Sequence, residues 1–359
     1  MTSSQQSIVI VGAGIVGLNT ALVLAERGFG KSITVVAEYL PGDTSATYTS
    51  PWAGCNFSAI SGTDANALRW DRLGYAHLAK LASMSGGEAF VKRTPSIEYW
   101  DEVVPRDKIE FMSGYLEDFQ ILPSTSLPAG VSFGISFTTF TLHAPKHCEY
   151  LRQRLKTQYG VHFIRRRLPS IAAAFLDPAL TKLVFNCVGL AAQTLPGVQD
   201  PKCYPTRGQV VLVRAPQVAT NIMRHGRDYE TYVIPRPRSA GHVVLGGFMQ
   251  KGDGDTSTYA SDTASILRRT TALSTELAQT EPEILTAAAG LRPSREGGAR
   301  VERENVSVPV NGHGHARTLV HNYGAGGTGF QAGYGMATDA VACVEDILFE
   351  VARGGRARL

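Results

Sequence analysis

Residues 7–17 read Ser7-Ile8-Val9-Ile10-Val11-Gly12-Ala13-Gly14-Ile15-Val16-Gly17, a short apolar run that passes directly into a glycine-rich turn. A helical stretch follows and ends near Gly28, and a second β-branched run, residues 33–37, ends at Glu38. The order strand, glycine turn, helix, strand, acid is typical of a dinucleotide-binding βαβ unit. The sequence therefore predicts a parallel α/β sheet with a nucleotide at the end of its first strand.

Each part of this segment has a physical role in such a unit. Gly12 permits the tight turn, Gly14 lets the backbone approach a pyrophosphate, and Gly17 lets the helix pack closely on the sheet. The helix N-terminus offers free N–H groups and a partial positive charge to the phosphates. Glu38 follows Gly14 by 24 residues, near the spacing of about 20 expected of an acid that binds ribose hydroxyls. The alternative is a glycine-rich turn that holds no ligand.

Length and composition favour a two-domain globular protein. The chain has 359 residues, more than the about 250–300 at which single cores usually split. Hydrophobic residues make up 43% and charged residues 18%, and no apolar stretch approaches the about 20 residues of a spanning helix. Residues 1–6 are polar and do not resemble a signal peptide. We therefore expect neither a membrane nor a secretory address.

Cysteine usage and charge exclude several other classes. The five cysteines are scattered and form no CxxC pair, which favours free thiols in a reducing compartment and argues against a metal site. The net charge is only +4, and residues 165–167 are the single tight basic run. A solvated strand end explains that run more simply than a nucleic-acid patch does.

A second glycine-rich turn lies near the end of the chain. A strand at residues 318–323 enters Gly324-Ala325-Gly326-Gly327-Thr328-Gly329, and a helix is expected from about 330 to 353. Two such turns, each opening a helix, indicate a long ligand held at two places. FAD fits this pattern, with its ADP half at the first turn and its flavin half at the second, whereas NAD enzymes do not usually need the second turn.

The predicted fold class is α/β, with a Rossmann-like FAD-binding domain interleaved with a sheet-rich α+β substrate-binding domain. The FAD-binding domain takes residues 1–60, 141–200 and 285–359, and the substrate-binding domain takes 61–140 and 201–284. Residues 161–164 and 183–189 read as buried parallel strands, because both faces are apolar. Three antiparallel strands are expected at 209–213, 231–234 and 242–246.

Further motifs follow in order along the chain. They are Ser50-Pro51-Trp52-Ala53-Gly54, Arg207-Gly208-Gln209, Tyr232-Val233-Ile234-Pro235-Arg236-Pro237, Gly290-Leu291-Arg292-Pro293 and His321-Asn322-Tyr323-Gly324. Together with the two glycine turns, these motifs resemble the D-amino-acid oxidase family of flavoproteins, which includes the D-aspartate oxidases. The resemblance spans nearly the whole chain.

The resemblance implies a substrate site. It places Arg292 and Tyr232 at the substrate carboxylate, where a planar guanidinium can donate two parallel hydrogen bonds. It places the backbone carbonyl of Gly327 near the substrate amine, and Asn56 over the pocket. The alternatives are a surface ion pair of Arg292 with Glu296 or Glu302, a core aromatic at Tyr232 and a structural asparagine at Asn56.

The resemblance also implies which residues contact FAD. They are Gly12, Ala13, Gly14, Ile15, Val16, Gly17, Glu38, Thr44, Ser45, Gly54, Leu168, Gly326, Gly327, Thr328, Gly329, Phe330 and Gln331. Thr44 and Ser45 would donate to the pyrophosphate, and the backbone of Leu168 would meet the adenine edge. The second turn and Gln331 would lie near the flavin edge that gains negative charge. Leu168 equally fits a core leucine, and Gln331 an ordinary polar residue.

The implied activity is the oxidative deamination of a D-amino acid to a 2-oxo acid, ammonia and hydrogen peroxide. The Cα–H leaves as a hydride to the flavin, so no side-chain base and no metal are required. The alternatives are a D-amino-acid oxidase for neutral substrates, a glycine or sarcosine oxidase, an NAD-dependent dehydrogenase, and a flavoprotein that only binds a partner.

Substrate preference rests on Arg224. D-aspartate oxidases carry an arginine a little before the tyrosine that binds the substrate carboxylate. Arg224 matches that arginine, with one extra residue between it and Tyr232. Met249 and the turn at residues 51–56 depart from that group. An arginine buried without its carboxylate would be costly. We expect a preference for acidic D-amino acids, D-aspartate and D-glutamate, with Arg224 lining the pocket. The alternative is a preference for neutral D-amino acids, with Arg224 pointing to solvent.

The last three residues, Ala357-Arg358-Leu359, match the small, basic, leucine pattern of a peroxisomal signal. The alternative is a frayed basic tail. Peroxide production gives a chemical reason for a peroxisomal location, with the import receptor as a partner. The composition is compatible with a homo-oligomer, and neither nucleic acid nor membrane is expected as a partner.

Overall fold

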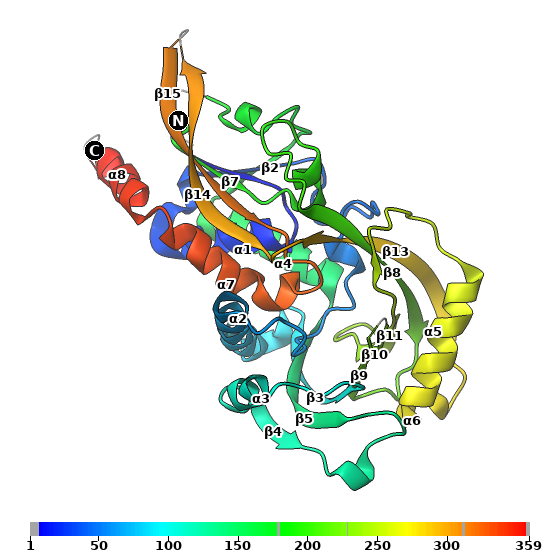
Figure 1. The fold of residues 1–359 in the computed structure, drawn as a ribbon. Helices are drawn as coiled ribbons and strands as arrows, with labels where there is room; N and C mark the ends of the chain where they lie inside the picture. Colours follow the sequence, from blue (N-terminus) through cyan, green and yellow to red (C-terminus); the bar gives the residue numbers. More distant parts are fainter. Residues whose placement is uncertain (1–6, 178–179, 228, 311–312, 357–359) are drawn as a thin grey trace. The chain divides into compact units, whose positions relative to one another are not determined.

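The computed structural model describes residues 7–177, 180–227, 229–310 and 313–356 (Figure 1). Two compact units divide the chain. The first consists of Met1–Ser50, Cys148–Tyr204 and Pro293–Leu359, and the second of Pro51–His147 and Pro205–Arg292. The division expected after residue 60 falls after Ser50, and those expected after residues 140, 200 and 284 fall after His147, Tyr204 and Arg292. Residues 357–359, the predicted targeting signal, lie outside the described residues.

The first unit contains a six-stranded sheet. Its strands are β1 (Ile8–Val11), β2 (Ile33–Ala37), β6 (His162–Arg165), β7 (Leu183–Asn186), β14 (Arg300–Val310) and β15 (His313–Tyr323). They are ordered β14-β15-β7-β1-β2-β6. All neighbours pair in parallel except β14 and β15. The central position of β1 brings its carboxyl end, and the glycine turn after it, between β2 and β7.

Four α-helices lie wholly or mainly within the described part of this unit, namely α1 (Ile15–Leu24), α4 (Ala144–Tyr159), α7 (Gly329–Ala342) and α8 (Glu345–Arg356). A short π-helical turn, Ala25–Phe29, ends α1, with Gly28 at a φ of 92°. Helices α1 and α7 pack against each other (Figure 1). One core cluster joins apolar residues of the sheet to these helices. Burial of this cluster, rather than helix propensity, holds the layers together.

Two predictions for the first unit were wrong in detail. Strand β6 is parallel as expected, but none of its four residues is fully buried, because β6 is the edge strand. The expected last helix is two helices, α7 and α8, which meet at Cys343 and Val344. The break keeps Val344 and Leu348 in the core. A sequence pattern does not reveal which strand lies at an edge or where a helix bends to stay on a core.

The second unit contains a nine-stranded sheet. Its strands are β3 (Val91–Trp100), β4 (Glu117–Ile121), β5 (Phe133–Leu142), β8 (Cys203–Arg214), β9 (Asn221–His225), β10 (Glu230–Pro235), β11 (His242–Gly246), β12 (Gln250–Lys251) and β13 (Glu283–Arg295). The order is β12-β8-β11-β10-β9-β3-β5-β4, with β13 paired to β8. Its helices are α2 (Ala65–Ala82), α3 (Arg106–Ser113), α5 (Ala260–Leu273) and α6 (Thr275–Ala278). The three predicted antiparallel strands are confirmed as parts of β8, β10 and β11.

None of the predicted strands corresponds to β9. Of the differences between prediction and structure, this one matters most for the site. Its sequence, Asn-Ile-Met-Arg-His, lacks the β-branched alternation that predicts a strand. The strand forms because β10 pairs with one of its edges and β3 with the other. Among the described residues, no helix is both long and apolar enough to cross a membrane.

Candidate functional site

The first glycine turn is shaped by close packing on both sides. Gly12 has a φ of 108°, and a Cβ atom there would lie 2.3 Å from the carbonyl oxygen of Cys187. A Cβ atom on Gly17 would lie 2.1 Å from the carbonyl oxygen of Gly12. Neither position can accept a side chain without moving backbone. These two glycines are therefore required by the fold itself.

Gly14 has a different environment, which fits a pyrophosphate. It is the N-cap residue of α1, and the first turn of α1 contains no acidic residue. A Cβ atom on Gly14 would meet side chains and not backbone, the Ser50 hydroxyl at 3.1 Å and Tyr48 Cε2 at 4.0 Å, and the Ser50 hydroxyl accepts a hydrogen bond from Ile15 N at 3.0 Å. Gly12, Gly14 and Val16 are half-buried, whereas the intervening residues are buried. The exposed backbone at a positive helix end suits the phosphates of FAD.

Glu38 lies beside this turn because β1 and β2 run in parallel. Gly12 N donates to Val36 O at 2.9 Å, so β2 ends next to the glycine turn. The Glu38 carboxylate is 42% exposed and lies 3.8 Å from Arg167. Thr44 is exposed and Ser45 half-buried in the loop that follows. The structure thus places Glu38 at the carboxyl ends of β1 and β2, with Thr44 and Ser45 in the loop that follows it.

The second glycine turn packs on the first helix. A Cβ atom on Gly329 would lie 3.3 Å from Ile15 Cγ2, and one on Gly333 would lie 3.2 Å from Asn19 Nδ2. The N-terminus of α7 therefore lies against the N-terminal turns of α1, as two contacts with one ligand require. Residues 325–330, which include the predicted Gly326, Gly327, Thr328 and Phe330, are half-buried or exposed. Gln331 is 2% exposed.

Leu168 and Gly54 are placed differently from the other predicted cofactor residues. The Leu168 side chain belongs to a core cluster that includes Val9, Val36 and Leu319. Only its backbone remains for the predicted adenine contact. Gly54 belongs to the second unit, where it packs against Tyr232.

In the second unit, Tyr232 lies in a slot lined by glycines. Tyr232 pairs with Gly246 across β10 and β11, and only 6% of it is exposed. Cβ atoms on Gly54, Gly246 and Gly247 would lie 3.2, 2.0 and 2.7 Å from the nearest atom of the Tyr232 ring. Any side chain at Gly246 or Gly247 would displace the ring. The slot therefore determines where the Tyr232 hydroxyl lies.

Arg292 lies beside Tyr232. Its Nη1 donates to Phe248 O at 3.0 Å, and a Cβ atom on Gly208 would lie 2.2 Å from the same nitrogen. Burial raises the pKa of Tyr232, and the neighbouring Arg292 charge opposes that rise. Glu302, the predicted alternative partner of Arg292, bonds to Arg300 at 2.6 Å. A half-buried guanidinium beside a phenol is an arrangement that can bind a carboxylate.

Asn56 contacts Met223, which lies beside Tyr232. Met223 was not among the predicted site residues. Asn56 Nδ2 lies 2.9 Å from Met223 Sδ and 3.3 Å from Phe57 O. Met223 pairs directly with Tyr232 across β9 and β10. Recognition of β9 as a strand would have found Met223, because directly paired residues share a face.

Arg224 does not lie with these residues. It follows Met223 in β9, so its side chain leaves the opposite face of the sheet. Its Nε donates to Asp101 Oδ1 at 2.8 Å, and its Nη2 donates to Ala129 O at 3.2 Å. Tyr229 donates to the other carboxylate oxygen of Asp101. Arg224 is therefore held by the protein on the face away from Tyr232.

His225, the next residue in β9, is buried between two carboxylates. Its Nδ1 lies 2.8 Å from Glu230 Oε2, and its Nε2 lies 3.2 Å from Glu98 Oε2. Ser58 also donates to Glu98, at 2.9 Å. Burial lowers the pKa of His225, but the bonds to Glu230 and Glu98 outweigh that effect and raise it to about 9. His225 is thus a buried imidazolium that ties β9 to β3 and β10.

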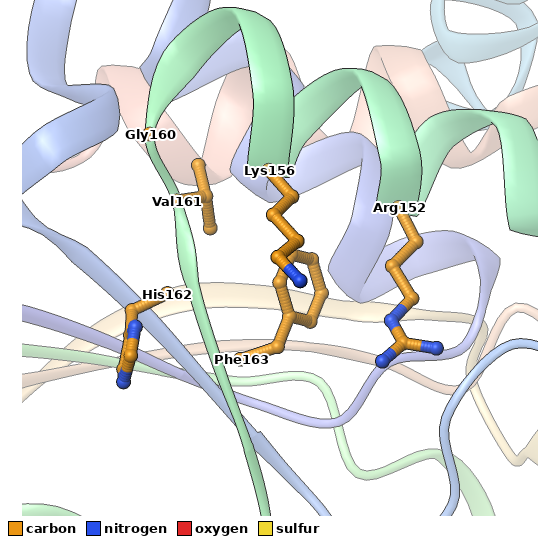
Figure 2. A pocket seen from close by; sticks show the side chains of 6 residues that line it. All are labelled: Arg152, Lys156, Gly160, Val161, His162 and Phe163. Carbon is orange, nitrogen blue, oxygen red and sulfur yellow. The ribbon is translucent and has the colours of Figure 1, made fainter.

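A pocket of about 300 Å³ lies between α4 and β6 in the first unit. Figure 2 shows Arg152 and Lys156 extending from α4 toward Phe163 of β6. The Arg152 guanidinium lies 5.8 Å from the centre of the Phe163 ring. None of the predicted site residues lines this pocket.

Comparison with known proteins places these features in context. A family model described as FAD dependent oxidoreductase matches residues 7–342. A D-amino-acid oxidase from Schizosaccharomyces pombe is 45% identical over 343 residues, which cover 94% of this chain and 95% of the relative. A D-aspartate oxidase from Cryptococcus neoformans var. grubii is 30% identical, over 94% of this chain and 96% of the relative.

Solved structures share the fold at lower identity. Glycine oxidase from Geobacillus kaustophilus matches with a TM-score of 0.69 at 18% identity, over 95% of this chain and 94% of that one. L-proline dehydrogenase from P. horikoshii also matches with a TM-score of 0.69, at 15% identity, over 93% of this chain and 91% of that one. These matches confirm the predicted α/β class.

Proposed function

The chain belongs to the FAD dependent oxidoreductase family, and from this premise we propose that it oxidises D-amino acids. Water and O₂ are consumed, and a 2-oxo acid, ammonia and hydrogen peroxide are released. The observation that carries the proposal is the pair of Arg292 and Tyr232 on one wall of the second unit, a neutral and a charged donor suited to an amino-acid carboxylate. The 45% identity to a D-amino-acid oxidase supports the same substrate class.

Different residues of the chain would bind FAD and orient the substrate. FAD, when bound, supplies the two-electron acceptor for the substrate Cα–H. The backbone of residues 12–17 and 326–329 and the Glu38 carboxylate would hold FAD. Arg292 and Tyr232 would bind the substrate carboxylate, and the Gly327 carbonyl would accept a hydrogen bond from the amine. This orientation would present one enantiomer's Cα–H for transfer.

We further propose that neutral D-amino acids are preferred, although the sequence alone favours acidic ones. The acidic preference requires Arg224 in the pocket with Tyr232. Arg224 instead lies on the other face of β9 and bonds to Asp101. An arginine that already has a carboxylate partner gives no reason to expect a second one in the substrate.

The test is peroxide release by the purified protein, with added FAD, on D-alanine, D-aspartate, L-alanine and glycine in parallel. We expect the highest kcat/KM with D-alanine and none with L-alanine. A preference for D-aspartate would restore the acidic assignment, and a preference for glycine would favour an amine oxidase of the same fold. If the folded, FAD-loaded protein released no peroxide with any of the four substrates, the proposal would be overturned.

Location in the peroxisome is a separate proposal. Its support is chemical, because the reaction releases hydrogen peroxide, and residues 357–359 match a peroxisomal signal. A fluorescent fusion should enter peroxisomes, and removal of Ala357, Arg358 and Leu359 should leave it in the cytosol. Equal distribution of the two fusions would contradict the proposal.

A further inference from the structure

Tyr232 and Arg292 together form the proposed carboxylate clamp. Residues 247–250 form a short segment beside it, which we call the strap, and three arginines from three elements donate hydrogen bonds to the strap. Arg269 of α5 donates to Gly247 O at 3.0 Å, and Arg292 of β13 donates to Phe248 O at 3.0 Å. Arg207 of β8 donates to Gln250 Oε1 at 2.5 Å. Arg207 is fully buried and Arg269 is half-buried. Only Arg292 has a role in the proposed chemistry, so the other two require an explanation.

Arg269 is distinctive because it also bonds to the strand that carries Tyr232. Its Nη1 donates to Glu230 O at 2.8 Å and to Thr231 Oγ1 at 2.6 Å. Its Nη2 reaches Gly247 O on the strap. Its guanidinium carbon lies 5.2 Å from the centre of the Phe248 ring. One planar group therefore contacts the residues just before Tyr232 and the residues that hold Arg292.

The two segments that Arg269 joins are also in direct contact. Gly247 N donates to Glu230 O at 3.0 Å, the same oxygen that accepts from Arg269. A Cβ atom on Gly247 would lie 2.7 Å from the Tyr232 ring. A shift of the strap would therefore move both Tyr232 and the carbonyl oxygen that holds Arg292.

We propose that Arg269 is a positioning residue that holds Tyr232 and Arg292 in one fixed relation, so that both donors meet the same substrate carboxylate. The inference rests on the proposed function. A guanidinium suits this role because its fork of donors is rigid and can bond to two segments at once. A bidentate site loses much of its affinity when its two donors move relative to each other, because productive geometry is demanding at the level of about 1 Å.

A simpler alternative is that Arg269 only stabilises the sheet. Both roles predict some loss of thermal stability when Arg269 is replaced. They differ in what happens to the folded, FAD-loaded protein. A positioning role predicts weaker binding of any carboxylate at the clamp, whereas a structural role leaves that affinity unchanged.

The experiment compares Arg269→Gln, Arg269→Lys and Arg268→Gln with the wild type. Arg268 is the exposed neighbour on the same helix and serves as the matched control. The probe is propionate, which has the carboxylate of D-alanine without its amine. Its affinity is measured from the change in flavin absorbance and from the rise in melting temperature, and KM and kcat are measured with D-alanine.

We expect Arg269→Gln to weaken propionate binding and raise KM at least about tenfold, with a smaller change in kcat. Arg269→Lys should recover part of the affinity, and Arg268→Gln should match the wild type. Unchanged propionate affinity in FAD-loaded Arg269→Gln would overturn the inference, as would failure of the wild type to bind propionate. Propionate binding without any peroxide release would instead contradict the proposed function and leave the positioning role standing.

Discussion

The two units differ in how they present groups to a ligand. In the first unit the candidate contacts are mainly backbone atoms, which are accessible because glycines stand at positions 14, 326, 327 and 329. In the second unit they are side chains, Tyr232 and Arg292, held by glycine slots and by other arginines. A backbone site is lost by adding atoms, whereas a side-chain site is lost by removing them.

This difference predicts separable defects. Cofactor affinity should respond to an added Cβ atom in the first unit, and substrate affinity should respond to lost donors in the second. Arg292→Leu and Gly14→Ala test that separation directly, and His225→Gln and Arg224→Ala test two features of the second unit, in order from the largest expected effect to the smallest.

Arg292→Leu should produce the largest loss. It removes the charged donor of the clamp, and truncating one partner of a buried charge pair costs about 2–5 kcal/mol. We expect kcat/KM for D-alanine to fall about a thousandfold while bound FAD per chain stays at the wild-type level. Loss of FAD in parallel with activity would break the separation of the two sites.

Gly14→Ala should act on the cofactor alone. The added Cβ atom would lie 3.1 Å from the Ser50 hydroxyl that caps Ile15 N, and it would stand where the pyrophosphate approaches. We expect the Kd for FAD to rise about tenfold, which corresponds to a loss of about 1.4 kcal/mol of binding free energy. KM for D-alanine at saturating FAD should not change.

The control for this variant is Gly114→Ala, at a surface turn of the second unit where the nearest atom to a Cβ is Phe111 O at 3.4 Å. It should bind FAD as the wild type does. Titration of the apoprotein with FAD, followed by fluorescence, gives both constants. Equal weakening in the two variants would show that the effect is not specific to the glycine turn.

His225 should make the stability of the second unit depend on pH. Its pKa is about 9 in the folded protein and about 6.5 when unfolded. The stabilisation is therefore complete below about pH 6.5 and is lost as the pH rises through 9, by at most about 1.4 kcal/mol per pH unit. His225→Gln should flatten this slope.

Urea unfolding at several pH values can measure this effect. All three tryptophans, Trp52, Trp70 and Trp100, belong to the second unit, so their fluorescence reports on it. Trp100 also stacks near His225, with ring centres 4.9 Å apart. A wild-type free energy of unfolding that is flat between pH 6.5 and 9 would contradict the assignment of a buried imidazolium.

Arg224→Ala should have the smallest effect on catalysis. Because Arg224 lies on the far face of β9, the variant should lower kcat/KM for D-alanine and D-aspartate equally, by less than about threefold. A much larger loss of kcat/KM with D-aspartate than with D-alanine would indicate that Arg224 lines the pocket. Steady-state kinetics on the two substrates is sufficient.

The part of the structure that follows from local pattern was predictable. The strand, glycine turn and helix at residues 7–24 were recognisable because hydrophobic periodicity and glycine chemistry act over short distances. The assignment to the D-amino-acid oxidase family depended on the order of several motifs. Strand β9 was not predictable, because its polar residues are extended only through pairing with β3 and β10.

The sequence by itself determined the residue types at the glycine turns and the clamp, because Gly14, Tyr232 and Arg292 are individually required by the chemistry that they would serve. Tertiary structure alone decided which face each side chain takes. Met223 and Arg224 are neighbours in sequence, yet one faces Tyr232 and the other bonds to Asp101. In a strand, a shift of one residue exchanges the two faces, so register decides whether an arginine can meet the substrate.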